Sequence, residues 1–281
     1  MEFIDLKGLL PEDIYNLLSC IKGLIEIRIR LGRSLQYLTT DCITRKIAYT
    51  ITQRDIDKII AAASGFSLYS VEEQLAKGYL FWQGGVRIGV SGVGVVRSGE
   101  LKTVKDISSL CIRIPSEVIG CANKLYFEYL NPKVINTLII SKAGRGKTTL
   151  IRDLSRLIGA KHNIVIVDER YEIAGINKIL STGELSDIIS GVPKYLVYEN
   201  VIRALNPEVV VFDELFLTND IDAVVDAVRS GVKVIASVHA PNQDELESNK
   251  RFAPLLHCFD LLVTLSDEGE VGRIESVTRL K

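Results

Sequence analysis

The chain has 281 residues, a hydrophobic content of 47%, a charged content of 25% and a formal net charge of -1. These values predict a globular protein of one large domain or two ordinary ones, and they exclude a global basic field for nucleic acid. Five cysteines without a Cys-x-x-Cys pair indicate reduced thiols. The acidic start resembles no signal peptide, and no apolar run approaches the roughly 18 residues of a membrane span. We therefore expect a cytoplasmic protein whose contact with a membrane, if any, is peripheral.

The first half of the chain mixes short helices and strands. Helical spacing of apolar residues predicts helices over residues 11–24 and 53–64. Alternating apolar and charged residues predict a strand with one solvated face over 24–32. Gly-Gly and Ser-Gly turns separate further strands within 78–100. This half is therefore predicted to be a smaller α+β domain.

The pattern changes after the turn signal Asn131-Pro132, so we predict domains at 1–130 and 131–281. The second half contains the short apolar runs "VINTLII", "NIVIVD", "EVVVFDE", "VKVIASVHA" and "LLVTLSD". Such continuous runs are typical of strands buried on both faces of a sheet. Helical patterns over 148–159 and 219–231 lie between them. This alternation predicts an α/β domain with a mostly parallel sheet and helices on both faces.

The stretch "SKAGRGKTT" stands between a predicted strand and a predicted helix, which is the context of a phosphate-binding P-loop. Its glycines let backbone N–H groups point at phosphate oxygens, and the helix N-terminus adds partial positive charge. Lys147 would reach the β- and γ-phosphates, and the Thr148 hydroxyl would bind Mg²⁺. The first residue of the usual motif is glycine, and here it is serine. The predicted nucleotide-binding residues are Ser141, Lys142, Ala143, Gly144, Arg145, Gly146, Lys147, Thr148 and Thr149.

Polar residues follow three other predicted strands, at the edge where open α/β sheets bind ligands. Asp213 and Glu214 end one strand, and an acidic residue there can hold Mg²⁺ or polarise the attacking water. Another strand ends in Asp168-Glu169-Arg170, with Glu172 close behind. His239 ends a fourth strand, where it is suited to sensing the γ-phosphate.

Together these motifs resemble the stage III sporulation protein AA family, which is related to the type II and type IV secretion ATPases. The resemblance spans nearly the whole chain. It includes "LPEDI", "EIRIRLGR", "YSVEEQLAKGY", "GGVRIGVSG" and "IRIPSEVIGCA" in the first half. In the second half it includes "GRGKTTLIRDL", "VDERYEIAG", "IISGVPK", "LNPEVVVFDEL" and "AVRSGVKVIASVHA".

The resemblance implies a RecA-like ATPase core behind a smaller N-terminal domain, with ATP and Mg²⁺ as ligands. It also implies a ring, expected to be a hexamer, that powers a secretion-like channel between mother cell and forespore, with membrane proteins of that channel as partners. The implied site residues are Lys147 in the Walker A loop, Glu169 or Glu172 for orienting water, Asp213 and Glu214 at the Walker B-like strand, and His239 in the histidine box. The loop "FLTND" after the Walker B-like strand is less charged than the resemblance leads us to expect.

Three other hypotheses share part of these features. A RecA-like ATPase acting on nucleic acid would need a basic, aromatic-bearing surface, against which the neutral charge argues. A GTP switch would need a guanine-reading Asn-Lys-x-Asp segment, which we do not find after the P-loop. A scaffold that binds nucleotide but hydrolyses little stays open because of Ser141. If the chain forms a ring, an arginine from a neighbour could complete the site, and Arg28, Arg30, Arg87 and Arg113 are the candidates.

Overall fold

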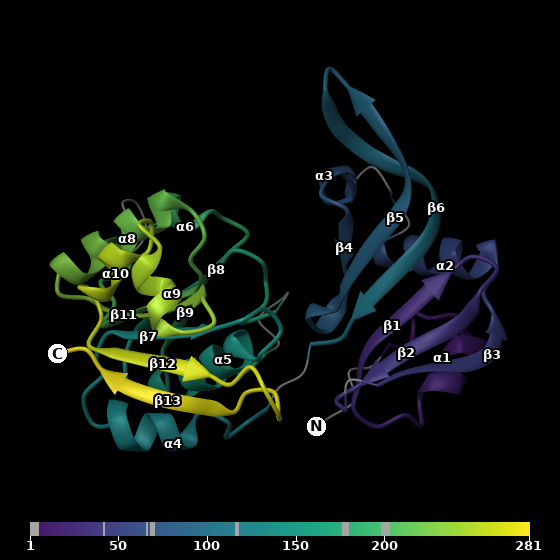
Figure 1. Ribbon diagram of the computed structural model, residues 1–281. Coiled ribbons are helices and arrows are strands. Elements are labelled where there is room, and N and C mark those ends of the chain that lie inside the picture. Colours follow the sequence, from purple (N-terminus) through teal and green to yellow (C-terminus); the bar gives the residue numbers. More distant parts are fainter. Residues whose placement is uncertain are drawn as a thin grey trace. The chain divides into compact units, whose positions relative to one another are not determined.

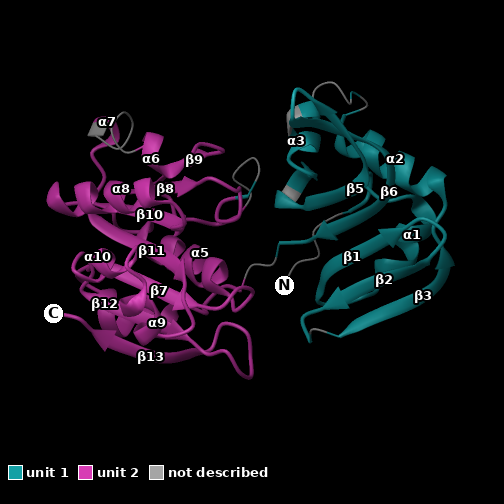
Figure 2. Ribbon diagram, turned by 45° about the horizontal axis from the view of Figure 1, so that its top comes forward, with its two compact units in different colours: residues 1–116, 175–179 teal, residues 117–174, 180–281 magenta. Residues whose placement is uncertain are grey.

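The computed structural model describes residues 6–41, 43–65, 67, 71–115, 118–175, 180–197 and 203–281. The chain divides into two compact units, which Figure 2 colours separately. Unit 1 consists of residues 1–116 with 175–179, and unit 2 of residues 117–174 with 180–281. Within the described ranges, none of the helices has the length and apolar character needed to cross a membrane.

Unit 1 is built around an antiparallel sheet (Figure 1). Its elements are α1 (Glu12–Leu18), β1 (Leu24–Arg30), β2 (Ser34–Thr39), β3 (Thr44–Thr50), α2 (Gln53–Ala63), α3 (Glu72–Ala76), β4 (Tyr79–Phe81), the 3-10 turn η2 (Gln83–Gly85), β5 (Arg87–Arg97) and β6 (Glu100–Arg113). The six strands of its described part follow the order β3-β2-β1-β6-β5-β4. Helix α1 is shorter than the predicted 11–24, whereas α2 matches its prediction and begins with a capping box between Thr52 and Asp55.

The two faces of this sheet have different chemistry, as the alternating sequence of β1 predicts. Ile27 and Ile29 are fully buried and belong to the core that also takes in residues of α1 and α2. Arg28 and Arg30 alternate with them and therefore lie on the opposite face. Cross-strand register places Arg113 opposite both Glu26 and Arg87, so all these residues share the solvated face. We call Arg28, Arg30, Arg87 and Arg113 the arginine face of unit 1.

Unit 2 is an α/β unit with a mostly parallel sheet, as predicted (Figure 1). Its elements are α4 (Asn123–Leu125), the π-helical turn η3 (Tyr126–Leu130), β7 (Thr137–Ser141), α5 (Lys147–Ile158), β8 (Ile164–Asp168), β9 (Ser186–Ser190), α6 (Lys194–Val197), α7 (Arg203–Leu205), β10 (Val209–Glu214), α8 (Thr218–Arg229), β11 (Lys233–His239), α9 (Gln243–Ser248), α10 (Ala253–Leu256), β12 (Leu261–Leu265) and β13 (Ile274–Arg279). The strand order in the described part is β13-β12-β7-β11-β10-β8-β9. Only the pairing of β12 with β13 is antiparallel among the described strand pairs of this sheet.

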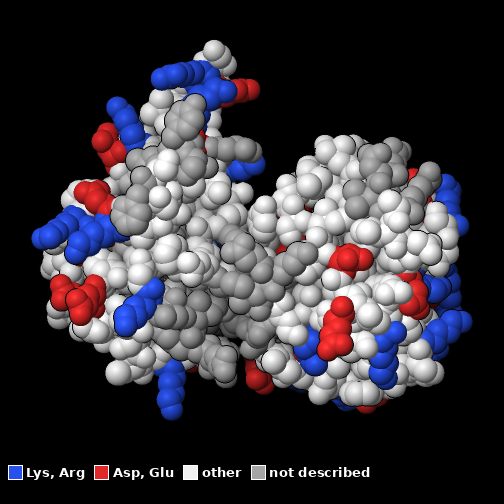
Figure 3. All heavy atoms as spheres, turned by 180° about the vertical axis from the view of Figure 1, so that it is seen from behind, with Lys and Arg blue, Asp and Glu red and all other residues white. Residues whose placement is uncertain are grey.

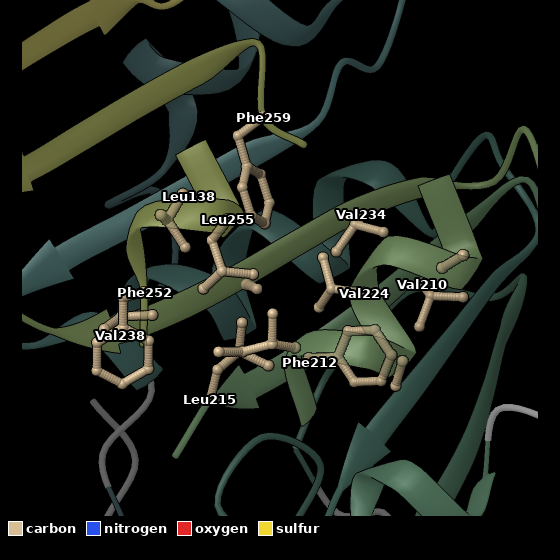
Figure 4. Close-up of a cluster of buried hydrophobic side chains, with 14 of the residues drawn as sticks. Leu138, Val210, Phe212, Leu215, Val224, Val234, Val238, Phe252, Leu255 and Phe259 are labelled. Carbon is tan, nitrogen blue, oxygen red and sulfur yellow. The ribbon is translucent and has the colours of Figure 1, made fainter. Parts of the chain in front are cut away.

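Two hydrophobic cores cover the two faces of the unit 2 sheet because alternate residues of each buried strand point to opposite sides. Leu138 and Ile140 of β7 pack in the core that includes α8 and α10, which Figure 4 shows. Ile139, between them, packs in the core that includes α5, where Leu150, Ile151 and Leu154 lie. The parallel strands therefore hold their carboxyl ends at one sheet edge between two layers of helices.

The boundary between the units lies earlier than the sequence suggested. We predicted it between residues 130 and 131, whereas the structure divides the chain between 116 and 117. Leu125, Tyr126 and Leu130 are at most 2% exposed and belong to the same core as α5. The buried Asp153 of α5 also accepts a 2.8 Å hydrogen bond from the backbone N–H of Ala122. Asn131-Pro132 is therefore a turn inside unit 2 rather than a boundary.

Two fragments of the chain test where the boundary between the units lies. We expect residues 118–281 to be more stable to urea than residues 131–281, because the shorter fragment lacks three large side chains of the core. Deleting one such side chain costs about 2 to 5 kcal/mol. Urea unfolding followed by circular dichroism compares the two free energies of unfolding. Equal values would place residues 118–130 outside the core and support the later boundary.

Candidate functional site

The P-loop connects β7 to α5, and its backbone suits the binding of an anion. Gly144 and Gly146 have φ angles of 74° and 91°, which favour glycine, and Gly146 is the N-cap of α5. A Cβ at Gly146 would also lie only 3.1 Å from the Cα of Gly272. The first N–H groups of α5 have no partner within the helix, so they face the loop with partial positive charge. This geometry fits phosphate.

The turn between β12 and β13, residues 266–273, holds the outer side of the P-loop. Lys142 Nζ lies 2.7 Å from Asp267 Oδ2. Arg145 Nε donates to the carbonyl of Ser266 at 2.8 Å, and its own carbonyl accepts the N–H of Gly272 at 3.1 Å. The side chains of Lys142 and Arg145, both predicted to bind nucleotide, are therefore occupied by this turn. The backbone N–H groups of the loop, rather than these two side chains, are therefore expected to face an anion.

Lys147 is folded back onto the end of β7. Its Nζ donates to the carbonyl of Ser141 at 2.9 Å, to Ser141 Oγ at 3.2 Å and to the carbonyl of Lys142 at 3.1 Å. It also lies 2.8 Å from His239 Nδ1. Burial lowers the pKa of Lys147 to about 8, although the charges of Glu214 and Asp213 oppose this. Ser141 thus gives the lysine a hydroxyl partner that a glycine at this position could not supply.

Thr148 and Asp213 form the candidate Mg²⁺ site. The Thr148 hydroxyl donates to Asp213 Oδ1 at 3.3 Å, at the junction of α5 and β10. Burial raises the pKa of Asp213 to about 7, and the charges of Glu172 and Asp168 add to the rise. These oxygen donors suit Mg²⁺, which commonly takes few protein ligands and completes its shell with phosphates and water. The described residues contain no group of three or more His, Cys, Asp or Glu side chains placed to hold a metal.

Glu214 and His239 meet at the ends of β10 and β11. His239 Nε2 lies 3.2 Å from Glu214 Oε2, and Arg170 Nη1 lies 3.2 Å from the same oxygen. His239 Nδ1 in turn lies 2.8 Å from Lys147 Nζ, so the imidazole stands between the lysine and the carboxylate. At the sheet edge, His239 therefore contacts both Lys147 and Glu214, two of the other predicted site residues.

The turn after β8 is fixed by two buried side chains that sequence analysis gave no role. The Asp168 carboxylate accepts the backbone N–H groups of Glu172, Ile173 and Ala174 at 2.7, 3.1 and 2.9 Å. Burial raises the pKa of Asp168, and these hydrogen bonds oppose that rise. From α5, the buried Arg152 donates to the carbonyls of Glu172 and Ile173. The sequence showed the strand-terminal carboxylate of Asp168, but no local signal linked Arg152 to this turn.

Glu169 points toward a different partner from Glu214. Its Oε2 lies 2.7 Å from Lys194 Nζ, at the start of α6. Lys194 ends the motif "IISGVPK", but sequence analysis assigned it no function, because the strand before it, β9, is too polar to be predicted as a buried strand. Of the predicted carboxylates, Glu214 and Asp213 thus lie beside the P-loop residues, while Glu169 is paired with Lys194.

The comparisons with known proteins agree with this fold. The sequence matches the family described as "Sporulation stage III, protein AA" over residues 9–281. The stage III sporulation protein AA of Bacillus subtilis (strain 168) is 33% identical over 289 residues, covering 97% of this chain and 94% of that protein. The solved ATPase DotB of Yersinia pseudotuberculosis has a TM-score of 0.62 and 17% identity, covering 90% of this chain and 73% of its own. The pilus retraction motor PilT, solved with bound ADP, also has a TM-score of 0.62, with 14% identity, covering 89% of this chain and 77% of its own.

The two structural likenesses lie at low identity, so they show that the chain shares the fold of secretion-type ATPases and carry no residue roles. The family match and the Bacillus subtilis relative, in contrast, extend over nearly the whole sequence. On that evidence the chain belongs to the stage III sporulation protein AA family.

Proposed function

We propose that the protein is a Mg²⁺-dependent ATPase whose copies form a hexameric ring that powers a secretion-like channel between mother cell and forespore. The observation that carries this proposal is the sheet edge of unit 2. There Lys147 contacts His239, His239 contacts Glu214, and Thr148 contacts Asp213. These are the groups that bind phosphates, hold Mg²⁺ and orient water in P-loop ATPases. The membrane proteins of the channel are its proposed partners.

In the proposed reaction, the N–H groups at the start of α5 bind the phosphates of ATP. Lys147 leaves its contacts with Ser141 and His239 and pairs with the β- and γ-phosphate oxygens. Thr148 and Asp213 would hold Mg²⁺, and the ion would neutralise charge on the phosphates. His239 keeps Glu214 in place near the γ-phosphate. Glu214 and Glu169 orient the attacking water.

The arginine face of unit 1 supports completion of the site by a neighbouring copy. The side chain of Arg28 is 39% exposed and that of Arg113 is 63% exposed, and both lie near Glu26. Arg30 donates to Gln36 at 2.8 Å, and the Arg87 guanidinium lies 4.4 Å from the centre of the Tyr79 ring. Such accessible guanidinium groups could stabilise charge on a phosphoryl group bound by another copy.

Trans-complementation tests both the ATPase activity and the ring. We expect turnover per subunit to rise with protein concentration, and to fall by about 10-fold or more in the double variant Arg28→Ala/Arg30→Ala. Mixing this variant with Lys147→Ala should restore part of the activity, because mixed rings place an intact P-loop beside intact arginines. Arg54→Ala, an exposed arginine of α2, is the matched control and should remain active. Activity that is independent of concentration and of both arginines would rule out this use of the arginine face.

A RecA-like ATPase acting on nucleic acid is the second candidate, because the arginine face with Tyr79 has groups that bind phosphate and bases. This hypothesis is weakened by Glu26, because its carboxylate pairs with Arg28 and Arg113 and would repel a phosphate. On the face of each unit that Figure 3 shows, Lys and Arg side chains are intermixed with Asp and Glu. Stimulation of turnover by a single-stranded oligonucleotide, reduced in Arg28→Ala/Arg30→Ala, would favour this candidate. A protein that binds ATP tightly without turnover would instead be the nucleotide-binding scaffold.

A further inference from the structure

Lys194 is a buried lysine beside the candidate site, and it has no part in the mechanism given above. The residue is only 4% exposed. Its Nζ lies 2.7 Å from Glu169 Oε2, whose side chain is 37% exposed. A buried ammonium is costly unless it is paired, so the ion pair fixes the lysine as well as the carboxylate. The Glu169 carboxylate is thus fixed by the buried lysine on one side, while the rest of its side chain remains accessible to solvent.

The backbone around Lys194 is joined to the turn after β8, which carries Glu169. The N–H of Gly191 donates to the carbonyl of Asp168 at 3.2 Å. Gly191 has a φ angle of 73°, and a Cβ there would collide with the hydroxyl of Tyr171. Strands β8 and β9 pair in parallel up to Asp168 and Ser190. Lys194 therefore has a defined place relative to Glu169, unlike a lysine on a free surface.

The charge of Lys194 also reaches the candidate Mg²⁺ site. The charges of Glu172 and Asp168 raise the pKa of Asp213, and the charge of Lys194 opposes this rise. The ammonium thus lies within electrostatic range of both Glu169 and Asp213.

We propose that Lys194 is a positioning residue for ATP hydrolysis, which holds the Glu169 carboxylate in the orientation that directs the attacking water. This inference rests on the proposed ATPase function. Without Lys194, a carboxylate that is more than a third exposed can rotate into solvent. Loss of such positioning typically costs about 10²-fold in rate.

The test compares Lys194→Met, Lys194→Arg, Glu169→Gln and the double variant Lys194→Met/Glu169→Gln in the full chain. We expect Lys194→Met to lower kcat by about 10- to 100-fold, with affinity for a fluorescent ATP analogue changed by less than about threefold. Lys194→Arg should regain most of the lost rate. The double variant should be no slower than Glu169→Gln, because both substitutions remove the same function, the positioning of the attacking water. Lys161→Met, which replaces an exposed lysine of unit 2, is the matched control and should resemble the wild type.

Several outcomes would overturn this role. A Lys194→Met protein with a kcat within twofold of wild type would do so, as would losses that multiply in the double variant. If Lys194→Met fails to fold, Glu169→Gln and Lys194→Arg still test the proposal. It then requires that Lys194→Arg retain most of the wild-type rate and that Glu169→Gln reduce it. A wild-type protein that binds ATP without turnover contradicts the proposed function itself, and the role of Lys194 with it. An active wild type with an equally active Lys194→Met variant contradicts the Lys194 inference alone.

Discussion

Replacing Lys147 with alanine is expected to lower ATP turnover by about 10³-fold or more. The Lys147 ammonium lies at the start of α5, 2.9 Å from the carbonyl of Ser141 and 2.8 Å from His239 Nδ1. Every phosphate that enters the loop would meet this charge in a site largely shielded from water. Alanine removes this charge together with the contact to His239 Nδ1. Steady-state phosphate release in the presence of Mg²⁺ measures the loss.

The control for this variant is Lys161→Ala, which removes the same charge from an exposed position of unit 2. It should leave turnover within about twofold of wild type. Turnover of Lys147→Ala within tenfold of wild type would contradict the proposed site, because the lysine would then contribute little to the transition state.

The pH dependence of the wild type provides a second readout of the same lysine. Burial lowers the pKa of Lys147 to about 8 in the nucleotide-free protein. The free protein therefore loses this positive charge as the pH rises through about 8, well below the ordinary lysine range. Phosphate binding favours the charged form, so nucleotide binding takes up a proton in that window. We expect the KM of the wild type for ATP to increase above pH 8. For Lys147→Ala, we expect the dissociation constant of the nucleotide to show no such increase.

The sequence predicted the sheet edge well because parallel strands bring their carboxyl ends together. Once "VINTLII", "NIVIVD", "EVVVFDE" and "VKVIASVHA" are assigned as buried strands, their terminal polar residues must share one edge. In the structure His239 contacts Lys147 and Glu214, and the charges of Glu214 and Asp213 act on Lys147. Their roles in catalysis stay predictions.

The features that were missed depend on contacts between distant segments. Strands β9 and β13 lie at the two edges of the unit 2 sheet and are only partly buried. Their sequences therefore contain polar residues and show no continuous apolar run. Without β9, the sequence offers no reason to place Lys194 beside Glu169. Without β13, the turn that occupies Lys142 and Arg145 has no visible connection with the P-loop. The boundary at residue 130 failed for the same reason, because Asn131-Pro132 is a strong local signal inside a shared core.

Replacing Asp213 with asparagine is expected to stabilise the Mg²⁺-free protein at pH 8, by about 1 to 3 kcal/mol in the free energy of unfolding. Asp213 is 5% exposed, and burial is the main reason that the pKa of its carboxyl group is raised to about 7. In the unfolded chain its pKa returns to about 3.8. Between these values the folded protein holds a proton that the unfolded chain has released. Stability contributed by this group is therefore lost as the pH rises from about 4 to 7, and above 7 the buried charge has its full cost.

Asparagine carries no such charge and can still accept the hydrogen bond of Thr148. Urea unfolding in the presence of a chelator should therefore show little difference between Asp213→Asn and wild type near pH 4, and the largest difference above pH 7. Asp222→Asn, an exposed position on α8, is the matched control and should change stability by less than about 0.5 kcal/mol. A variant less stable than wild type at pH 8 would contradict the buried-charge cost. A gain in stability combined with loss of Mg²⁺-dependent turnover would mean that the chain retains this carboxylate for its function, at the expense of its fold.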